Sequence, residues 1–237
     1  MNFWYILMII FTIMTFFASF IIRRKQNRSA LIGYITWILL SLYFIVEYIV
    51  IKTTEAPYNF YKQPMSDLGV TTCGKNTYDI ANYLICSPNH LLMNWTFTLT
   101  GIAIFVGAIL IQPSWPNHRR IKLATILLII FGLSYSVSGI IPADINFKWH
   151  TLSALPGMVV HIPALIMIGN SVKTKWPKLS IWTYVCVFIS TTSLLLLFFQ
   201  PFFDLPGGLL QRILYGSVYL WMTVTAIILW KYERITN

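Results

Sequence analysis

The chain has 237 residues, of which 57% are hydrophobic and only 10% are charged, whereas a soluble domain has roughly 25% charged residues. This composition excludes an ordinary soluble protein and is typical of a chain that crosses a membrane several times. The formal net charge of +10 does not indicate nucleic-acid binding, because the basic residues form short clusters between apolar runs, as orientation signals do.

Seven apolar runs each have about the 20 residues that a helix needs to cross the hydrocarbon core. They predict an all-α polytopic transmembrane helical bundle, one domain over residues 1–237, with spans at about 3–22, 30–51, 91–112, 121–141, 151–170, 179–200 and 208–230. The first run is unlike a secretory signal peptide, because it lacks a basic leading segment and its positive charges follow it. We therefore expect it to be a retained helix.

Most of the 17 Lys and Arg residues lie after the first, third and fifth spans or in the C-terminal tail. With seven spans, these segments share one side of the membrane, which the positive-inside rule makes cytoplasmic. The N-terminus is thus predicted outside and the C-terminus in the cytoplasm. Every acidic residue except Glu233 falls on the outer side, so an acid-dependent site is expected there.

The connection at residues 52–90 is the largest segment between spans and is predicted to be extracytoplasmic. Its prolines favour an irregular loop with a short helix or hairpin. Cys73 and Cys86 would face an oxidising compartment, where a disulfide between them could close a loop. A redox enzyme is a weak alternative, because their spacing is not that of a CxxC motif. The familiar nucleotide-binding, metalloprotease and serine-hydrolase motifs are absent from the sequence.

Ionisable residues within spans are costly and therefore suggest function. His161 lies near the middle of the fifth span, where a structural hydrogen bond and a role in catalysis or ligand binding are both open. Glu47, near the outer end of the second span, could pair with Arg212 near the start of the last span. Alternatively, Arg212 could capture a lipid phosphate.

Polar residues near the predicted outer face could supply acid–base chemistry. Ser66 and Asp67 occur in "MSDLG", where an Asx-turn or a cap is the ordinary role of such an acid. Asp144 and His150 occur in "PADINFKWH", the predicted turn between the fourth and fifth spans. The sequence does not decide whether these four side chains converge.

The segments "MSDLG", "NWTFTLTGI", "GLSYSVSGIIPAD" and "QRILYGSVYLW" occur in an order that resembles the bacterial integral membrane proteins of domain-of-unknown-function family 998, over about residues 30–230. The resemblance implies a multi-pass protein of a bacterial plasma membrane, without naming a substrate. It implies recurrent polar positions at Ser66, Asp67, Asn94, Asp144, His150 and Arg212. It also implies close helix approach at Gly69, Gly101, Gly132 and Gly139.

A looser similarity links the chain to the ceramidase-like intramembrane metal hydrolases, through its seven spans, its outer N-terminus and its Ser/Asp element. This similarity implies a zinc ion held by His90, His150 and Asp67 or Asp144, with Ser66 assisting. The chain departs from that pattern because no histidine follows His161, so the late HxxxH element is missing.

Three classes of function are compatible with these observations. The leading one is an enzyme acting on a lipid or lipid-linked substrate at the outer face; the others are a partner-binding accessory protein and a small-solute or proton-coupled transporter. Membrane lipids are expected partners. For the enzyme, the expected catalytic residues are Asp67, Asp144, His150 and His161, and the expected substrate-binding residues are Ser66, Asn94, Glu47 and Arg212.

Overall fold

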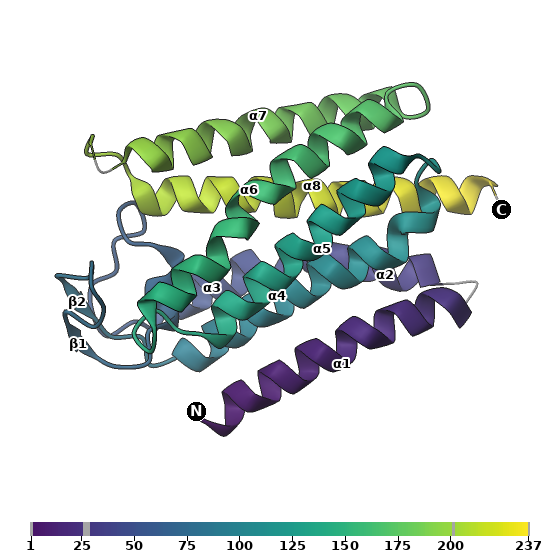
Figure 1. The fold of residues 1–237 in the computed structure, drawn as a ribbon. Helices are drawn as coiled ribbons and strands as arrows, with labels where there is room; N and C mark the ends of the chain where they lie inside the picture. The colour runs from purple at the N-terminus through teal and green to yellow at the C-terminus, as the bar shows by residue number, and fades with distance from the viewer. Residues whose placement is uncertain (1, 26–28, 201, 237) are drawn as a thin grey trace.

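The computed structural model describes residues 2–25, 29–200 and 202–236; Arg28, one of the predicted orientation signals, lies outside them. Seven helical segments in this part of the chain are long and apolar enough to cross a membrane, which confirms the seven-span all-α bundle (Figure 1). The elements are α1 (Phe3–Lys25), α2 (Ser29–Leu39), α3 (Leu42–Lys52), η1 (Met65–Gly69), β1 (Gly74–Lys75), β2 (Leu84–Ile85), α4 (His90–Ile111), η2 (Gln112–Ser114), α5 (Arg119–Ile140), α6 (Phe147–Val172), α7 (Pro177–Phe199) and α8 (Gly207–Thr236).

The two ends of the bundle differ in structure. One end, here called the loop end, carries the N-terminus, the segment between α3 and α4, and the turns α5–α6 and α7–α8 (Figure 1). The opposite end carries the C-terminus and the turns α4–α5 and α6–α7. The assignment of the loop end to the outside of the cell stays a prediction.

The second span is not one continuous helix, because it is interrupted at Leu40 and Ser41 between α2 and α3. The Ser41 N–H and hydroxyl both donate to the Ile38 carbonyl, at 3.2 and 2.9 Å. These i to i−3 bonds replace the i to i−4 pattern and tighten the turn. After the break, α3 places Tyr43 and Glu47 in the interior of the bundle.

Glycines let α4 and α5 pack backbone to backbone. A methyl group on Gly132 would come within 2.7 Å of the Phe105 nitrogen, and one on Gly139 within 2.8 Å of the Asn94 carbonyl oxygen. A methyl group on Gly101 would overlap Ser136 and the Gly132 carbonyl. Side chains larger than hydrogen would therefore separate the two helices.

Helix α6 continues through Pro156 and Pro163. At the first of these, the hydroxyl of Ser134 in α5 accepts the Gly157 N–H at 2.9 Å and donates to the Ser153 carbonyl. In an undisturbed helix the Gly157 N–H would donate directly to the Ser153 carbonyl, and here the Ser134 hydroxyl bridges the two groups. The insertion ties α5 to α6.

The segment between α3 and α4 is folded against the loop end. Its short antiparallel hairpin pairs Gly74 with Ile85, and a disulfide joins Cys73 to Cys86. The Leu209 N–H at the start of α8 donates to the Tyr61 carbonyl at 3.0 Å. The segment is therefore attached to α8, and it holds η1 at the loop end of the bundle.

Candidate functional site

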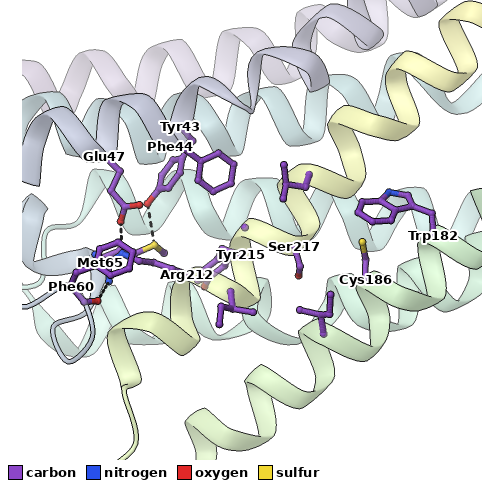
Figure 2. Close-up of a pocket in the computed structure, with 14 residues that line it drawn as sticks. Tyr43, Phe44, Glu47, Phe60, Met65, Trp182, Cys186, Arg212, Tyr215 and Ser217 are labelled. Carbon is purple, nitrogen blue, oxygen red and sulfur yellow. Dashed lines mark hydrogen bonds and ion pairs between the residues drawn. The ribbon is translucent and has the colours of Figure 1, made fainter.

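A cavity of about 350 Å³ lies between α3, α7 and α8. It is lined by Tyr43, Phe44 and Glu47 of α3, Phe60 and Met65 of the loop segment, Trp182, Cys186 and Ile189 of α7, and Arg212, Ile213, Tyr215, Gly216, Ser217 and Leu220 of α8. Figure 2 shows Glu47 and Arg212 at one end of this cavity and Trp182 at the other. The wall is therefore almost wholly apolar, with its charged groups gathered at the loop end.

The cavity opens toward the side of the bundle. Ile213 and Leu220, on its α8 wall, are 38% and 46% exposed, whereas Cys186 on α7 is only 1% exposed. The opening thus has exposed apolar side chains at its rim and a buried interior. Since α3, α7 and α8 are membrane-spanning segments, the surroundings of this opening would be lipid chains.

A buried ion pair closes the polar end of the cavity. The Arg212 Nε lies 3.0 Å from Glu47 Oε1, and both side chains are less than a tenth exposed. Arg212 also donates to the carbonyls of Phe60, Gln63 and Gly208 at 3.0–3.1 Å, and to the Tyr58 hydroxyl. Most of its five N–H groups therefore have protein partners, and its arrangement favours the ion-pair alternative over capture of a lipid phosphate.

Asp67 is nearly fully buried in η1 and is surrounded by hydrogen-bond donors. It accepts from the Tyr78 hydroxyl, from the Tyr83 hydroxyl at 2.8 Å, and from Gln63 Nε2 at 3.4 Å. Burial raises the pKa of Asp67 to about 6, although these donors and the Arg212 charge oppose the increase. The carboxylate holds the hairpin on η1.

Asp144 and His150 have other partners. Asp144 Oδ2 accepts from the Thr71 N–H at 2.9 Å and from the hydroxyls of Thr71 and Thr72 at 2.7 and 3.2 Å. His150 Nδ1 faces the carbonyl oxygens of Ser138 and Ile141, at 3.1 and 2.7 Å. Asp67, Asp144 and His150 therefore do not share one hydrogen-bonded centre.

A smaller cavity of about 30 Å³ brings two of the expected residues together. Ser66 and His150 both line it, together with Gln211. Met65 and Tyr215 line this cavity as well as the large one, so the two cavities are neighbours. No sequence pattern links Gln211 to Ser66, because Gln211 lies 145 positions further along the chain and in a different element.

His161 and Asn94 lie outside both cavities. His161 is completely buried, its Nδ1 lies 2.9 Å from the Gly157 carbonyl, and its Nε2 has no hydrogen-bond partner in the described part of the chain. Asn94 Nδ2 donates to the Gly69 carbonyl at 2.8 Å and to the Tyr5 hydroxyl at 3.2 Å. Asn94 thus connects α4 to η1 and α1, which is a structural role.

The residues suggested as zinc ligands do not fit a metal ion. Within residues 2–25, 29–200 and 202–236, no group of three His, Cys, Asp or Glu side chains is placed to hold one. His90 Nδ1 lies 3.1 Å from the Ser87 carbonyl, while Asp67, Asp144 and His150 have the separate partners described above. These four side chains therefore do not converge on one zinc site.

Sequence reasoning missed most of the large cavity. Trp182, Cys186 and Ser217 are neither charged nor part of a motif, and an apolar residue of a span gives no sign of whether it faces lipid, a neighbouring helix or a cavity. One weak indication of the cavity is present in the sequence: Glu47 and Arg212 fall near the same end of two spans. A buried pair of opposite charges indicates where two helices meet.

Comparison with known proteins places the chain in a family. The family model described as "Protein of unknown function (DUF998)" matches residues 41–228, from just before α3 into α8. The chain belongs to the DUF998 family. The match covers both cavities and leaves out α1 and α2. No curated protein and no solved structure matches the chain.

Proposed function

We propose that this DUF998 protein binds a hydrocarbon chain of a membrane lipid or lipid-linked molecule between α3, α7 and α8. The observation that carries the proposal is the large cavity, which is apolar along its length, open to the side of the bundle and closed at the loop end by the Glu47–Arg212 pair. A ligand from the bilayer could enter sideways without passing through water.

The dimensions suit a chain. Arg212 and Leu220 are eight positions apart on α8, which corresponds to about 12 Å along the helix axis. The cavity volume of about 350 Å³ falls at the lower end of the range of roughly 300–1,000 Å³ for small-molecule sites. A polar ligand would meet few hydrogen-bonding groups along this wall, and burying polar groups without partners is costly.

The position of the charges supports an orientation for the ligand. Glu47 and Arg212 lie near the ends of α3 and α8 that face the loop end, so the membrane interface is expected beside them. A head group would then lie near this interface while the chain extends toward Trp182. The proposal places the polar part of the ligand on the side that the positive-inside rule predicts to be outside.

A photolabelling experiment tests the proposal. The protein would be placed in phosphatidylcholine nanodiscs containing phosphatidylcholine with a diazirine at the end of one acyl chain, and irradiated. Because Cys186 and Ser217 are buried, we expect adducts on these two residues, located by fragmentation of their peptides, only if a chain enters the cavity. Adducts confined to outward-facing residues such as Phe188, with none at Cys186 and Ser217, would overturn the proposal.

Two tryptophan substitutions on α7 provide a matched comparison. Ile189→Trp adds a large side chain to the cavity wall, whereas Ile181→Trp changes a residue that is 66% exposed. The first should abolish adducts at Cys186 and Ser217, and the second should leave them unchanged. Equal labelling in both variants would show that the chain reaches these residues by another route.

A further inference from the structure

The small cavity at the loop end contains polar groups that have no other partner. Its volume of about 30 Å³ exceeds the minimum of roughly 10–15 Å³ for one water molecule. Ser66, His150 and Gln211 line it, from η1, α6 and α8 respectively. The Ser66 hydroxyl, His150 Nε2 and Gln211 Nε2 have no hydrogen-bond partner in the described part of the chain.

The carbonyl contacts of His150 determine its tautomer. Both oxygens near Nδ1, those of Ser138 and Ile141, can only accept, so Nδ1 must carry the hydrogen. In the neutral imidazole, Nε2 then has the free lone pair. This nitrogen makes no hydrogen bond with another residue of the described chain. His150 is therefore a base held in a fixed orientation by two backbone carbonyls.

Ser66 and Gln211 supply the complementary groups. The Ser66 hydroxyl makes no hydrogen bond within the part of the chain that the structure describes, and the residue is only half-buried. Gln211 Oε1 accepts the Met65 N–H at 2.8 Å, which fixes the side-chain amide so that Nε2 is the donor left over. A hydroxyl, a base and an N–H donor thus border one cavity.

We propose that the small cavity is a catalytic centre for cleaving carboxylic esters, with Ser66 as nucleophile, His150 as general base and Gln211 as the donor to the carbonyl oxygen. Ser66 Oγ would bond to the ester carbonyl carbon as its proton passes to His150 Nε2. The ester C–O bond then breaks, and the leaving alcohol takes that proton. A water molecule then loses a proton to His150 as its oxygen bonds to the acyl carbon. The bond from that carbon to Ser66 Oγ breaks, the acid leaves, and Ser66 Oγ takes the proton back from His150 Nε2.

The substrate class rests on the proposed function, whereas the catalytic residues do not. A lipid whose chain occupied the large cavity would have its head group near Met65 and Tyr215, which border both cavities. Met65 is a flexible side chain that could shift to admit an ester group. The expected substrate is therefore an amphiphilic ester taken from the membrane.

A fluorophosphonate–biotin probe tests the nucleophile directly. In this reaction Ser66 Oγ would form a bond to phosphorus, fluoride would leave, and the Oγ proton would pass to His150. We expect the wild-type protein in detergent to be labelled, and Ser66→Ala and His150→Asn to lose labelling. The asparagine amide can still donate to the two carbonyls, so His150→Asn removes the base while preserving the anchor.

Two variants serve as controls for this labelling. Ser171→Ala removes a half-buried serine that is bonded to the Met167 carbonyl, and His90→Asn removes a histidine that faces the Ser87 carbonyl. Both should be labelled like the wild type. Labelling of Ser66→Ala at the wild-type level, or no labelling of the wild type, would overturn the assignment. Either result would leave the diazirine adducts at Cys186 unaffected, so the two proposals fail separately.

A second measurement uses a smaller reagent, which does not require space for the biotinylated probe. In Ser66→Cys, a neighbouring base should increase the thiolate fraction, so methyl methanethiosulfonate at pH 7 should react about tenfold faster than in Ser66→Cys/His150→Asn. Cys186 is buried and the other two cysteines are bonded, which leaves the new thiol as the reactive one. Equal rates in the two variants would contradict a base at His150.

Discussion

Glu47 of α3 and Arg212 of α8 form an ion pair, with 3.0 Å between Oε1 and Nε, where both side chains are less than a tenth exposed. Arg212 also holds the carbonyls of Phe60 and Gln63, so one guanidinium joins two helices to the loop segment. The polar end of the large cavity therefore depends on this residue.

The first prediction concerns removal of that guanidinium. Arg212→Met leaves the Glu47 carboxylate buried without a partner, which should lower the free energy of unfolding by about 3–5 kcal/mol. Denaturant unfolding in detergent, followed by tryptophan fluorescence, measures this loss. The control is Lys62→Met, because the Lys62–Asp204 pair is exposed and should contribute only about 0–1 kcal/mol. Equal losses in the two variants would contradict the role of Arg212.

The second prediction concerns pH. Asp67 has a pKa of about 6 in the folded protein and an ordinary value of 3.8, so the folded state binds the proton more tightly. The stabilisation that comes from this tighter proton binding is complete below about pH 4 and is lost as the pH rises through 6. Relative to Asp67→Asn, the wild type should lose up to about 3 kcal/mol between pH 4 and 7. Denaturant unfolding of both proteins across this pH range measures the loss. A difference in the free energy of unfolding between the two proteins that does not vary with pH would contradict the prediction.

The third prediction concerns the contact between α4 and α5. Gly101→Ala places a methyl group against the α5 backbone, which cannot yield as a flexible side chain does, so the unfolding free energy should fall by about 1–3 kcal/mol or more. In Gly207→Ala the methyl group would meet Gln200 at an ordinary 3.4 Å, and a change below about 1 kcal/mol is expected. Thermal unfolding of both variants decides whether close helix approach is required.

The fourth prediction concerns the disulfide between Cys73 and Cys86. The loop that it closes contains Tyr78 and Tyr83, the two hydroxyl donors to Asp67. Replacing both cysteines by serine should cost about 3 kcal/mol through the greater freedom of the unfolded chain. Reductant should lower the midpoint of the wild type to that of the double variant. A wild-type midpoint unaffected by complete reduction would contradict the prediction.

The fold was largely predictable from hydropathy, whereas its interruptions were not. The seven spans follow from the length of the apolar runs, because the bilayer requires about 20 apolar residues per helix. Nothing in the sequence around Leu40 and Ser41 indicates a break, since neither proline nor glycine is present there. The break depends on local hydrogen bonds to the Ile38 carbonyl, which composition does not reveal.

The candidate site was only partly predictable, because its contacts join distant parts of the chain. The pairing of Glu47 with Arg212 was one of two alternatives, favoured by the cost of burying either charge alone. The tyrosine partners of Asp67 could not be identified, because they depend on how the hairpin folds over η1. The sequence also gave no indication that Asp144 would be bound by Thr71 and Thr72, away from His150.

The central claim is that a lipid chain occupies the space between α3, α7 and α8. A cryo-electron microscopy structure of the protein in phosphatidylcholine nanodiscs tests it most directly. We predict an elongated density that starts near Arg212, passes between Phe44 and Cys186, and ends near Leu220 and Trp182. A cavity that is filled by these protein side chains, with lipid density only on the outer surface of the helices, would contradict the account.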